Sequence, residues 1–249
     1  MFDSLSIPTI LVSYVALLFS LSVHEASHAG AAHQLGDDTA ARLGRLTLNP
    51  LAHMDPLGTF VFPLLGMATG FPFIGWAKPV PVDPRNLSRR FTQRGGMALV
   101  AAAGPASNLV LAGIFLTLLI VLVKLSGVPR MLEFRLFAHA LLARKVEMLQ
   151  VLQLSTGLTL GLALSGKLVL INIGLALFNL LPMGPLDGSG IVRGLLPWQW
   201  LPKYDRVQPW MGGVLIVLAL TGLLGYVIGP VFGVILTGVE AIAHLFLGV

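Results

Sequence analysis

The chain has 249 residues, of which 55% are hydrophobic and only 11% are charged, and its formal net charge is +5. Soluble domains carry about 25% charged residues, so this composition excludes an ordinary soluble protein and indicates an integral membrane protein. Because cysteine is absent, disulfides and thiolate metal sites are excluded, and we attribute the positive charge to loops beside lipid headgroups rather than to nucleic-acid binding.

Five apolar segments are long enough to cross a bilayer, which takes about 20 mostly apolar residues. They lie at about 8–35, 96–125, 166–182, 207–226 and 227–248. The first ends in His24 and Glu25 rather than in a small-residue cleavage site, so we expect it to be retained and not to be a cleaved signal peptide.

Two further segments are less clear. Residues 57–75 are apolar but interrupted by proline and glycine, which predicts either a re-entrant hairpin or a marginal helix. Residues 130–150 mix leucine with basic residues, which favours an amphipathic helix at the interface. Residues 1–249 are therefore expected to form a single all-α polytopic domain with five to six spans.

The distribution of basic residues predicts the orientation. Loops 76–95 and 187–206 are both rich in Lys and Arg, whereas the N-terminus carries Asp3 and no basic residue. Because basic loops stay in the cytoplasm, we expect a multi-pass protein of the cell membrane with its N-terminus outside. The basic residues between Arg130 and Lys145 do not fit this arrangement.

A motif typical of metal-dependent hydrolases ends the first apolar segment. His24-Glu25-Ala26-Ser27-His28 matches H-E-x-x-H, and on a helix His24 and His28 lie one turn apart on the same face. Two imidazoles there bind one metal ion, and Glu25 can act on a water molecule as the general base. Ionisable groups at membrane depth are costly, which favours this function over a chance match.

A catalytic zinc site usually has three protein ligands, and the sequence leaves the third open. His33 lies five residues after His28, which turns it away from the metal face, and His53, His139 and His244 lack supporting context. Asp187 is the better candidate, because proline and glycine around it break the helix and can turn its carboxylate toward the bundle. The alternative for Asp187 is a helix cap.

Five motifs in order along the chain together resemble the site-2 protease family of intramembrane zinc metalloproteases. They are HEASHA from His24, NPLAHMDPLGT from Asn49, GWAKPVPV from Gly75, GPASN from Gly104 and NLLPMGPLDG from Asn179. The resemblance is to the short membrane-only branch, without PDZ or CBS domains. It implies that one Zn²⁺ per chain is bound by His24, His28 and Asp187.

The resemblance also assigns a role to one asparagine, and the sequence itself draws attention to a second. Asn179 corresponds to the family residue that positions substrate or stabilises the oxyanion. Asn108 is polar within an apolar helix, where it either bonds a neighbouring helix or contacts substrate.

The segment GWAKPVPV is β-prone. Pro79 and Pro81 leave one usable edge, on which Lys78, Val80 and Val82 can pair with an extended substrate. The resemblance supports a small β element at the membrane surface, and a plain structural hairpin is the alternative.

We therefore expect a zinc endopeptidase that cleaves within or near a substrate's transmembrane segment on the cytoplasmic side, with a transmembrane protein or peptide as its substrate. The alternative is a metal transporter or an inactive scaffold of the same fold. A metal carrier does not need the carboxylate of Glu25 beside its ligands, and the half-chain repeats of transporters are not found.

Overall fold

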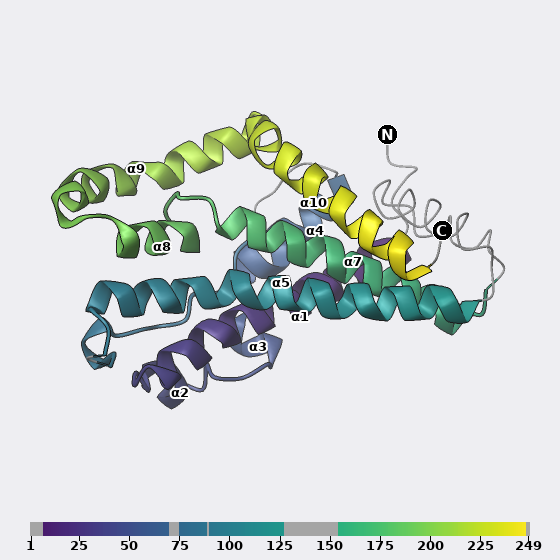
Figure 1. The fold of residues 1–249 in the computed structure, drawn as a ribbon, viewed down its shortest axis with the longest axis horizontal. Coiled ribbons are helices and arrows are strands. Elements are labelled where there is room, and N and C mark those ends of the chain that lie inside the picture. Colours follow the sequence, from purple (N-terminus) through teal and green to yellow (C-terminus); the bar gives the residue numbers. More distant parts are fainter. Residues whose placement is uncertain (1–6, 70–74, 89, 127–153, 248–249) are drawn as a thin grey trace.

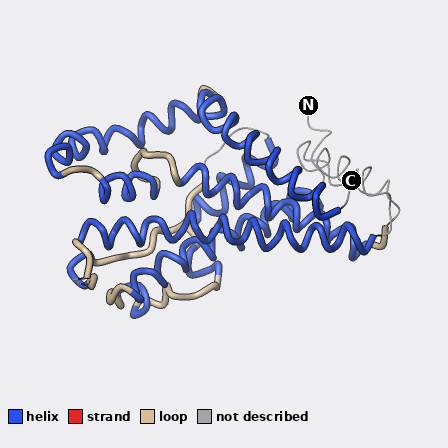
Figure 2. Tube along the Cα trace, in the orientation of Figure 1, coloured by secondary structure: helices blue, strands red, loops and turns tan. Residues whose placement is uncertain are grey.

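A computed structural model describes residues 7–69, 75–88, 90–126 and 154–247, and this part of the chain is helical without any strand (Figures 1 and 2). The described elements are α1 (Ile7–Gln34), α2 (Thr39–Arg42), α3 (Pro50–His53), η1 (Pro56–Val61), α4 (Phe62–Thr69), η2 (Pro84–Asn86), α5 (Gln93–Ser126), α7 (Thr156–Asn179), α8 (Asp187–Leu195), η4 (Trp198–Trp200), α9 (Leu201–Leu220) and α10 (Leu223–Leu247).

Helix α5 is the centre of the bundle, and α1, α7 and α10 pack against it. Leu119 and Val123 of α5 are buried against Leu162 of α7 and Leu247 of α10. The other end of α5 packs on α1, where Ala32 is fully buried. The bundle therefore brings the far end of α1, which carries the H-E-x-x-H motif, against α5.

Four of the described helices are long and apolar enough to cross a membrane, against the five to six spans expected from the sequence. They cover Thr9–Gln34, Gln93–Ser126, Thr156–Asn179 and Leu223–Leu247. Helix α7 begins ten residues before the predicted segment 166–182, because Ser155 caps it by accepting a hydrogen bond from the Leu158 N–H.

The expected spans 207–226 and 227–248 are divided differently in the structure. Helix α9 begins earlier and carries Lys203, Asp205 and Arg206 in its first turns, so it is not among the helices apolar enough to cross. The break falls at Gly222, whose φ of 75° lies in the left-handed region that glycine adopts readily, and Pro230 is accommodated inside α10.

The two ends of the segment expected at 57–75 lie side by side. Helices η1 and α4 together are too short for a span, and beyond the undescribed residues 70–74 the Trp76 N–H donates to the Gly58 carbonyl at 3.0 Å. The Trp76 ring also packs against Phe62. This return supports the re-entrant alternative. The interfacial helix predicted at 130–150 lies outside the described residues.

The expected β element is absent from the described residues, and 75–83 is an extended segment bonded to loops instead. The Lys78 N–H donates to the His53 carbonyl at 2.8 Å, and the Arg45 guanidinium donates to the Lys78 and Pro79 carbonyls. Asp37, fully buried beyond α1, accepts the Asp83 N–H at 2.8 Å. The backbone of 75–83 thus bonds side chains and helix ends rather than a second strand. A sheet needs a second strand, which explains why the expected β element did not form.

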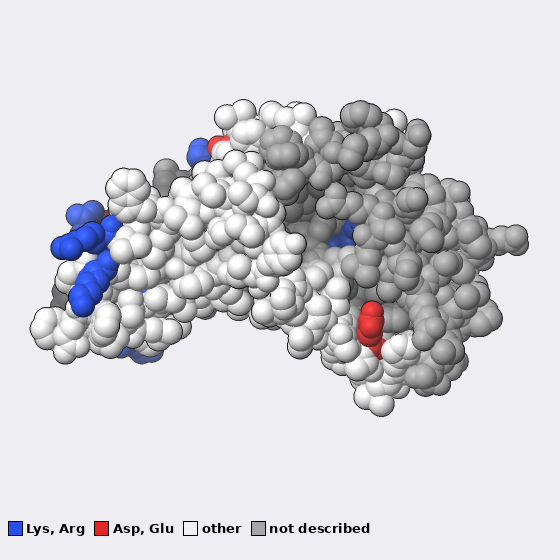
Figure 3. Space-filling view, turned by 90° about the horizontal axis from the view of Figure 1, so that it is seen from above, with Lys and Arg blue, Asp and Glu red and all other residues white. Residues whose placement is uncertain are grey.

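On one face of the molecule, the basic side chains lie mainly at one end. Figure 3 shows a face almost free of Lys, Arg, Asp and Glu, with Lys and Arg gathered at the left end, where Figure 1 places α8 and the start of α9. The start of α5 lies at that end as well, so the predicted basic loops share one side of the bundle.

Candidate metal centre

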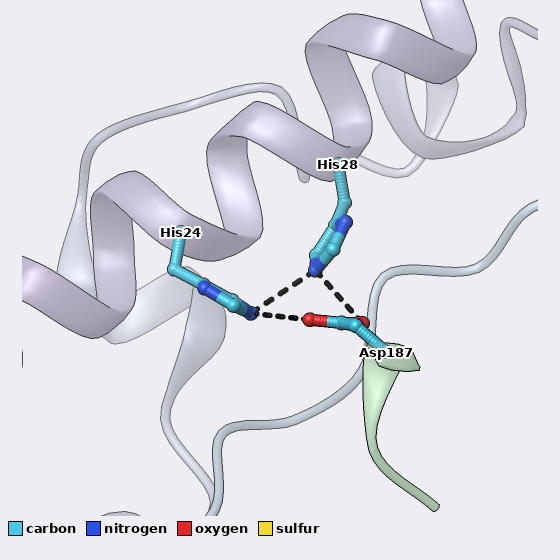
Figure 4. A group of neighbouring side chains, drawn as sticks. All are labelled: His24, His28 and Asp187. Carbon is cyan, nitrogen blue, oxygen red and sulfur yellow. Dashed lines mark hydrogen bonds and ion pairs between the residues drawn. The ribbon is translucent and has the colours of Figure 1, made fainter. Parts of the chain in front are cut away.

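Helix α1 places the two histidines of the motif side by side. Their rings are 4.7 Å apart between centroids, and the Nε2 atoms of His24 and His28 face each other at 3.1 Å (Figure 4). Both side chains are buried, with 4% and 8% of the residue exposed. The i, i+4 spacing thus presents two nitrogen atoms to one point, as the sequence predicts.

Asp187 reaches the same point from the other half of the chain. Its Oδ2 lies 3.1 Å from His24 Nε2, and its Oδ1 lies 3.3 Å from His28 Nε2. Asp187 is the first residue of α8, and Gly188 beside it fits under the Leu180 and Leu181 carbonyls, which a Cβ atom would approach to within 2.4 Å. The tight turn before α8 therefore needs this glycine in order to aim the carboxylate.

The far nitrogen of each imidazole is held by α5. His28 Nδ1 lies 2.8 Å from the Val100 carbonyl oxygen, and His24 Nδ1 lies 2.6 Å from Asn108 Oδ1. A carbonyl only accepts, so His28 donates through Nδ1 and keeps a lone pair on Nε2. The same arrangement at His24 directs both lone pairs toward Asp187.

Three hydrogen-bond acceptors therefore converge without a donor between them, which is repulsive unless a cation lies there. Asp187 Oδ2 is buried and has no hydrogen-bond partner among the residues that the structure describes, and the three candidate ligand atoms lie within 4.8 Å of one another. A tetrahedral zinc site with bonds of about 2.0–2.1 Å separates its ligand atoms by about 3.3 Å. Nitrogen and carboxylate donors at the observed spacings fit that ion.

Asp187 is the anionic member of the group. Its carboxylate brings a negative charge to a site with two neutral imidazoles.

Glu25 follows His24 directly and is 9% exposed. Its carboxylate makes no hydrogen bond with any residue in the described ranges, and it is not one of the three clustered ligands. The sequence-based hypothesis of a general base requires a carboxylate that is not engaged in this way.

Gly104 of α5 is what lets the two histidines pack against that helix. A Cβ atom at this position would lie 2.4 Å from His28 Nε2 and 2.6 Å from His24 Cε1, far inside van der Waals contact. Pro105 follows it and is also buried. The sequence did not lead us to expect this close approach, although a Gly-Pro step inside an apolar helix is a signal that could have indicated it.

Gly104→Ala is expected to weaken zinc binding about tenfold to a hundredfold, because overpacking of about 1–3 kcal/mol falls on the ligands themselves. Competition with a chelator of known affinity measures this. The matched control is Gly113→Ala in the same helix, whose added Cβ meets nothing within 4 Å. Equal zinc affinity in both variants would contradict the prediction.

The other predicted residues lie at different distances from the centre. Asn108 contacts His24, a candidate metal ligand, directly, whereas the Asn179 amide donates to the Leu175 carbonyl of its own helix at 3.0 Å. The Lys78 backbone is engaged by His53 and Arg45. The backbone groups of Val80 and Val82 make no hydrogen bond with described residues.

Alternative ligands from the sequence lie elsewhere. His33 Nδ1 pairs with Asp38 at 2.7 Å, and His53 Nε2 donates to the Thr47 carbonyl at 2.8 Å. Among the described residues, His24, His28 and Asp187 are the one group of this kind. Sequence reasoning missed Asn172, the partner of Asn108, although a lone amide in an apolar span is itself a signal.

The profile of Peptidase family M50 matches residues 12–222. The chain is 37% identical over 234 residues to "Putative zinc metalloprotease YwhC" of Bacillus subtilis strain 168, which covers 93% of this chain and 89% of that protein. It is 31% identical over 207 residues to "Putative zinc metalloprotease Rip2" of Mycolicibacterium smegmatis, covering 83% and 66% respectively. No solved structure matches the chain.

Proposed function

Because the chain belongs to peptidase family M50, the site-2 type of zinc metalloprotease, we propose that it hydrolyses a peptide bond within or near the transmembrane segment of a membrane-protein substrate. The observation that carries this proposal is the convergence of His24, His28 and Asp187 beside Glu25. Both histidines lie inside the apolar stretch Thr9–Gln34, so the reacting groups are set where a substrate helix would lie.

His24, His28 and Asp187 would hold one zinc ion per chain. When bound, zinc supplies a Lewis acid that polarises the scissile carbonyl and lowers the pKa of water to about 7. Glu25 accepts the proton of the attacking water and returns it to the leaving amine. Val100 and Asn108 hold the imidazole rings in the orientation that this requires.

The substrate is expected to be extended at the scissile bond, because peptide groups in a helix are shielded. The free backbone groups of Val80 and Val82 support pairing with such a strand, whereas Lys78 is engaged within the chain. Asn179 remains a proposed contact to substrate or oxyanion.

Val80→Pro is expected to raise KM with little change in kcat, and an unchanged KM would reject the pairing.

Chelation of the metal tests the proposed function directly. The protein is placed in lipid vesicles with fluorescently labelled single-pass segments, including hydrophobic regions of signal peptides, and cleavage is followed by mass spectrometry. We expect cleavage that stops on zinc removal and returns with stoichiometric zinc. Zinc uptake into vesicles without cleavage would favour the transporter alternative, and failure to bind zinc would favour the scaffold.

We propose that the active site lies on the cytoplasmic side and the N-terminus outside the cell membrane, and the basic end seen in Figure 3 supports this. Native cysteine is absent, so a single introduced cysteine has no background. Arg85→Cys should react with an impermeant thiol reagent only after the cell membrane is opened. Reaction in intact cells would reverse the orientation.

A further inference from the structure

A chain of hydrogen bonds between buried polar side chains leads from the candidate metal centre through the bundle. His24 on α1 contacts Asn108 on α5 at 2.6 Å, and Asn108 Nδ2 lies 2.7 Å from Asn172 Oδ1 on α7. Asn172 Nδ2 then lies 2.9 Å from Ser20 Oγ, back on α1. Both asparagines and the serine are 0% exposed, so water does not compete for these groups.

The end of this hydrogen-bond chain that lies away from His24 sets the direction of every hydrogen bond in the chain. Asn172 Nδ2 also lies 2.8 Å from the Leu168 carbonyl, and Ser20 Oγ lies 2.7 Å from the Ala16 carbonyl. Backbone carbonyls only accept, so Asn172 must present its NH₂ group on that side and Ser20 must donate its hydroxyl proton to Ala16. Ser20 Oγ consequently accepts from Asn172.

The same logic carries to the metal ligand. With its NH₂ group used, Asn172 offers only its carbonyl oxygen to Asn108, which must therefore turn its own NH₂ group toward Asn172. The remaining Asn108 Oδ1 faces His24, and an oxygen acceptor there requires His24 to carry its proton on Nδ1. The lone pair is left on Nε2, the atom that faces Asp187.

We infer that Asn172 is a positioning residue of the metal centre, which acts through Asn108 to hold His24 with its Nε2 lone pair directed at the metal. The inference rests on the proposed function, because it concerns the same site. In the described structure Asn172 makes its hydrogen bonds with Asn108, Ser20 and Leu168 rather than with the ligand cluster, so its effect is transmitted by one amide. A residue that only joined helices would stabilise the fold without affecting the metal.

Asn172→Leu tests this, since leucine has a similar volume and no hydrogen-bonding group. A group that hydrogen-bonds a metal ligand typically contributes 10–100-fold to metal affinity. Asn172 acts through Asn108 rather than on His24 itself, so we expect its replacement to lower zinc affinity about tenfold. Zinc affinity should fall further in Asn108→Leu. It should fall less in Ser20→Ala, because the Leu168 carbonyl still holds Asn172 when the Ser20 hydroxyl is gone. Zinc affinity is measured by chelator competition in detergent.

A second readout separates positioning from stability. Cobalt is substituted for zinc, and the visible absorption of the bound ion reports whether its ligand geometry is altered in Asn172→Leu. The control is Ser165→Ala, which removes a buried side-chain hydrogen bond two turns earlier on the same face of α7. It should leave zinc affinity and the cobalt spectrum unchanged, and Asn172→Ala serves if the leucine variant does not fold.

The outcomes are distinct. Weakened zinc binding and a changed cobalt spectrum in the Asn172 variants, with both unchanged in Ser165→Ala, support the positioning role. Wild-type affinity and spectrum in a folded Asn172 variant overturn it while leaving the proposed function intact. If the wild-type protein itself binds no zinc, both the proposed function and this inference fall together.

Discussion

Glu25→Gln is expected to reduce peptide hydrolysis by at least about 10²–10⁴-fold, the usual contribution of a general base, and to leave one zinc ion per chain. Glutamine keeps the size of the side chain but cannot accept a proton from the attacking water. Zinc should stay because Glu25 lies outside the cluster formed by His24, His28 and Asp187. The measurements are the cleavage rate under saturating zinc and the zinc content by mass spectrometry.

Ser27→Ala is the matched control for this variant. Ser27 lies two residues further along α1, and its hydroxyl bonds only the Val23 carbonyl of the same helix. Its removal should leave cleavage and zinc content at wild-type values. Full cleavage activity in Glu25→Gln would exclude Glu25 as the base, whereas loss of zinc from it would show that this carboxylate helps to bind the metal.

Asp187→Ala is expected to remove both zinc and activity. The variant loses the anionic ligand and leaves two neutral imidazoles facing each other at 3.1 Å. The loss in affinity should exceed the 10–100-fold typical of groups that only support a ligand. Zinc content after dialysis against a weak chelator measures it, with thermal unfolding of the metal-free protein to show that the fold is kept.

Asp38→Ala is the control for the loss of a carboxylate. Asp38 lies just beyond α1, where it is about half exposed and pairs with His33. It should retain zinc and activity. Full zinc in Asp187→Ala would remove Asp187 from the ligand set and direct the search to His53, whose Nδ1 is buried and has no hydrogen-bond partner in the described structure.

Much of the site could be predicted from local sequence. The spacing of His24 and His28 dictates that they share a helix face, because the helical repeat is set by neighbouring backbone dihedrals. The low charge content likewise dictates that the long helices are of the membrane type. The extended segment 75–83 was expected to join a sheet, but β pairing needs a partner strand, and side chains such as Arg45 took its place.

Sequence alone therefore determined the class of protein, and it predicts two ligands and a base, since each depends on residues within one or two helical turns. Only the tertiary structure decided that Asp187 meets the histidines, that Gly104 makes room for them, and that Asn172 bonds Asn108, the partner of His24. These contacts join α1, α5, α7 and α8. They depend on how helices distant in sequence pack, and local backbone preference carries no record of that packing.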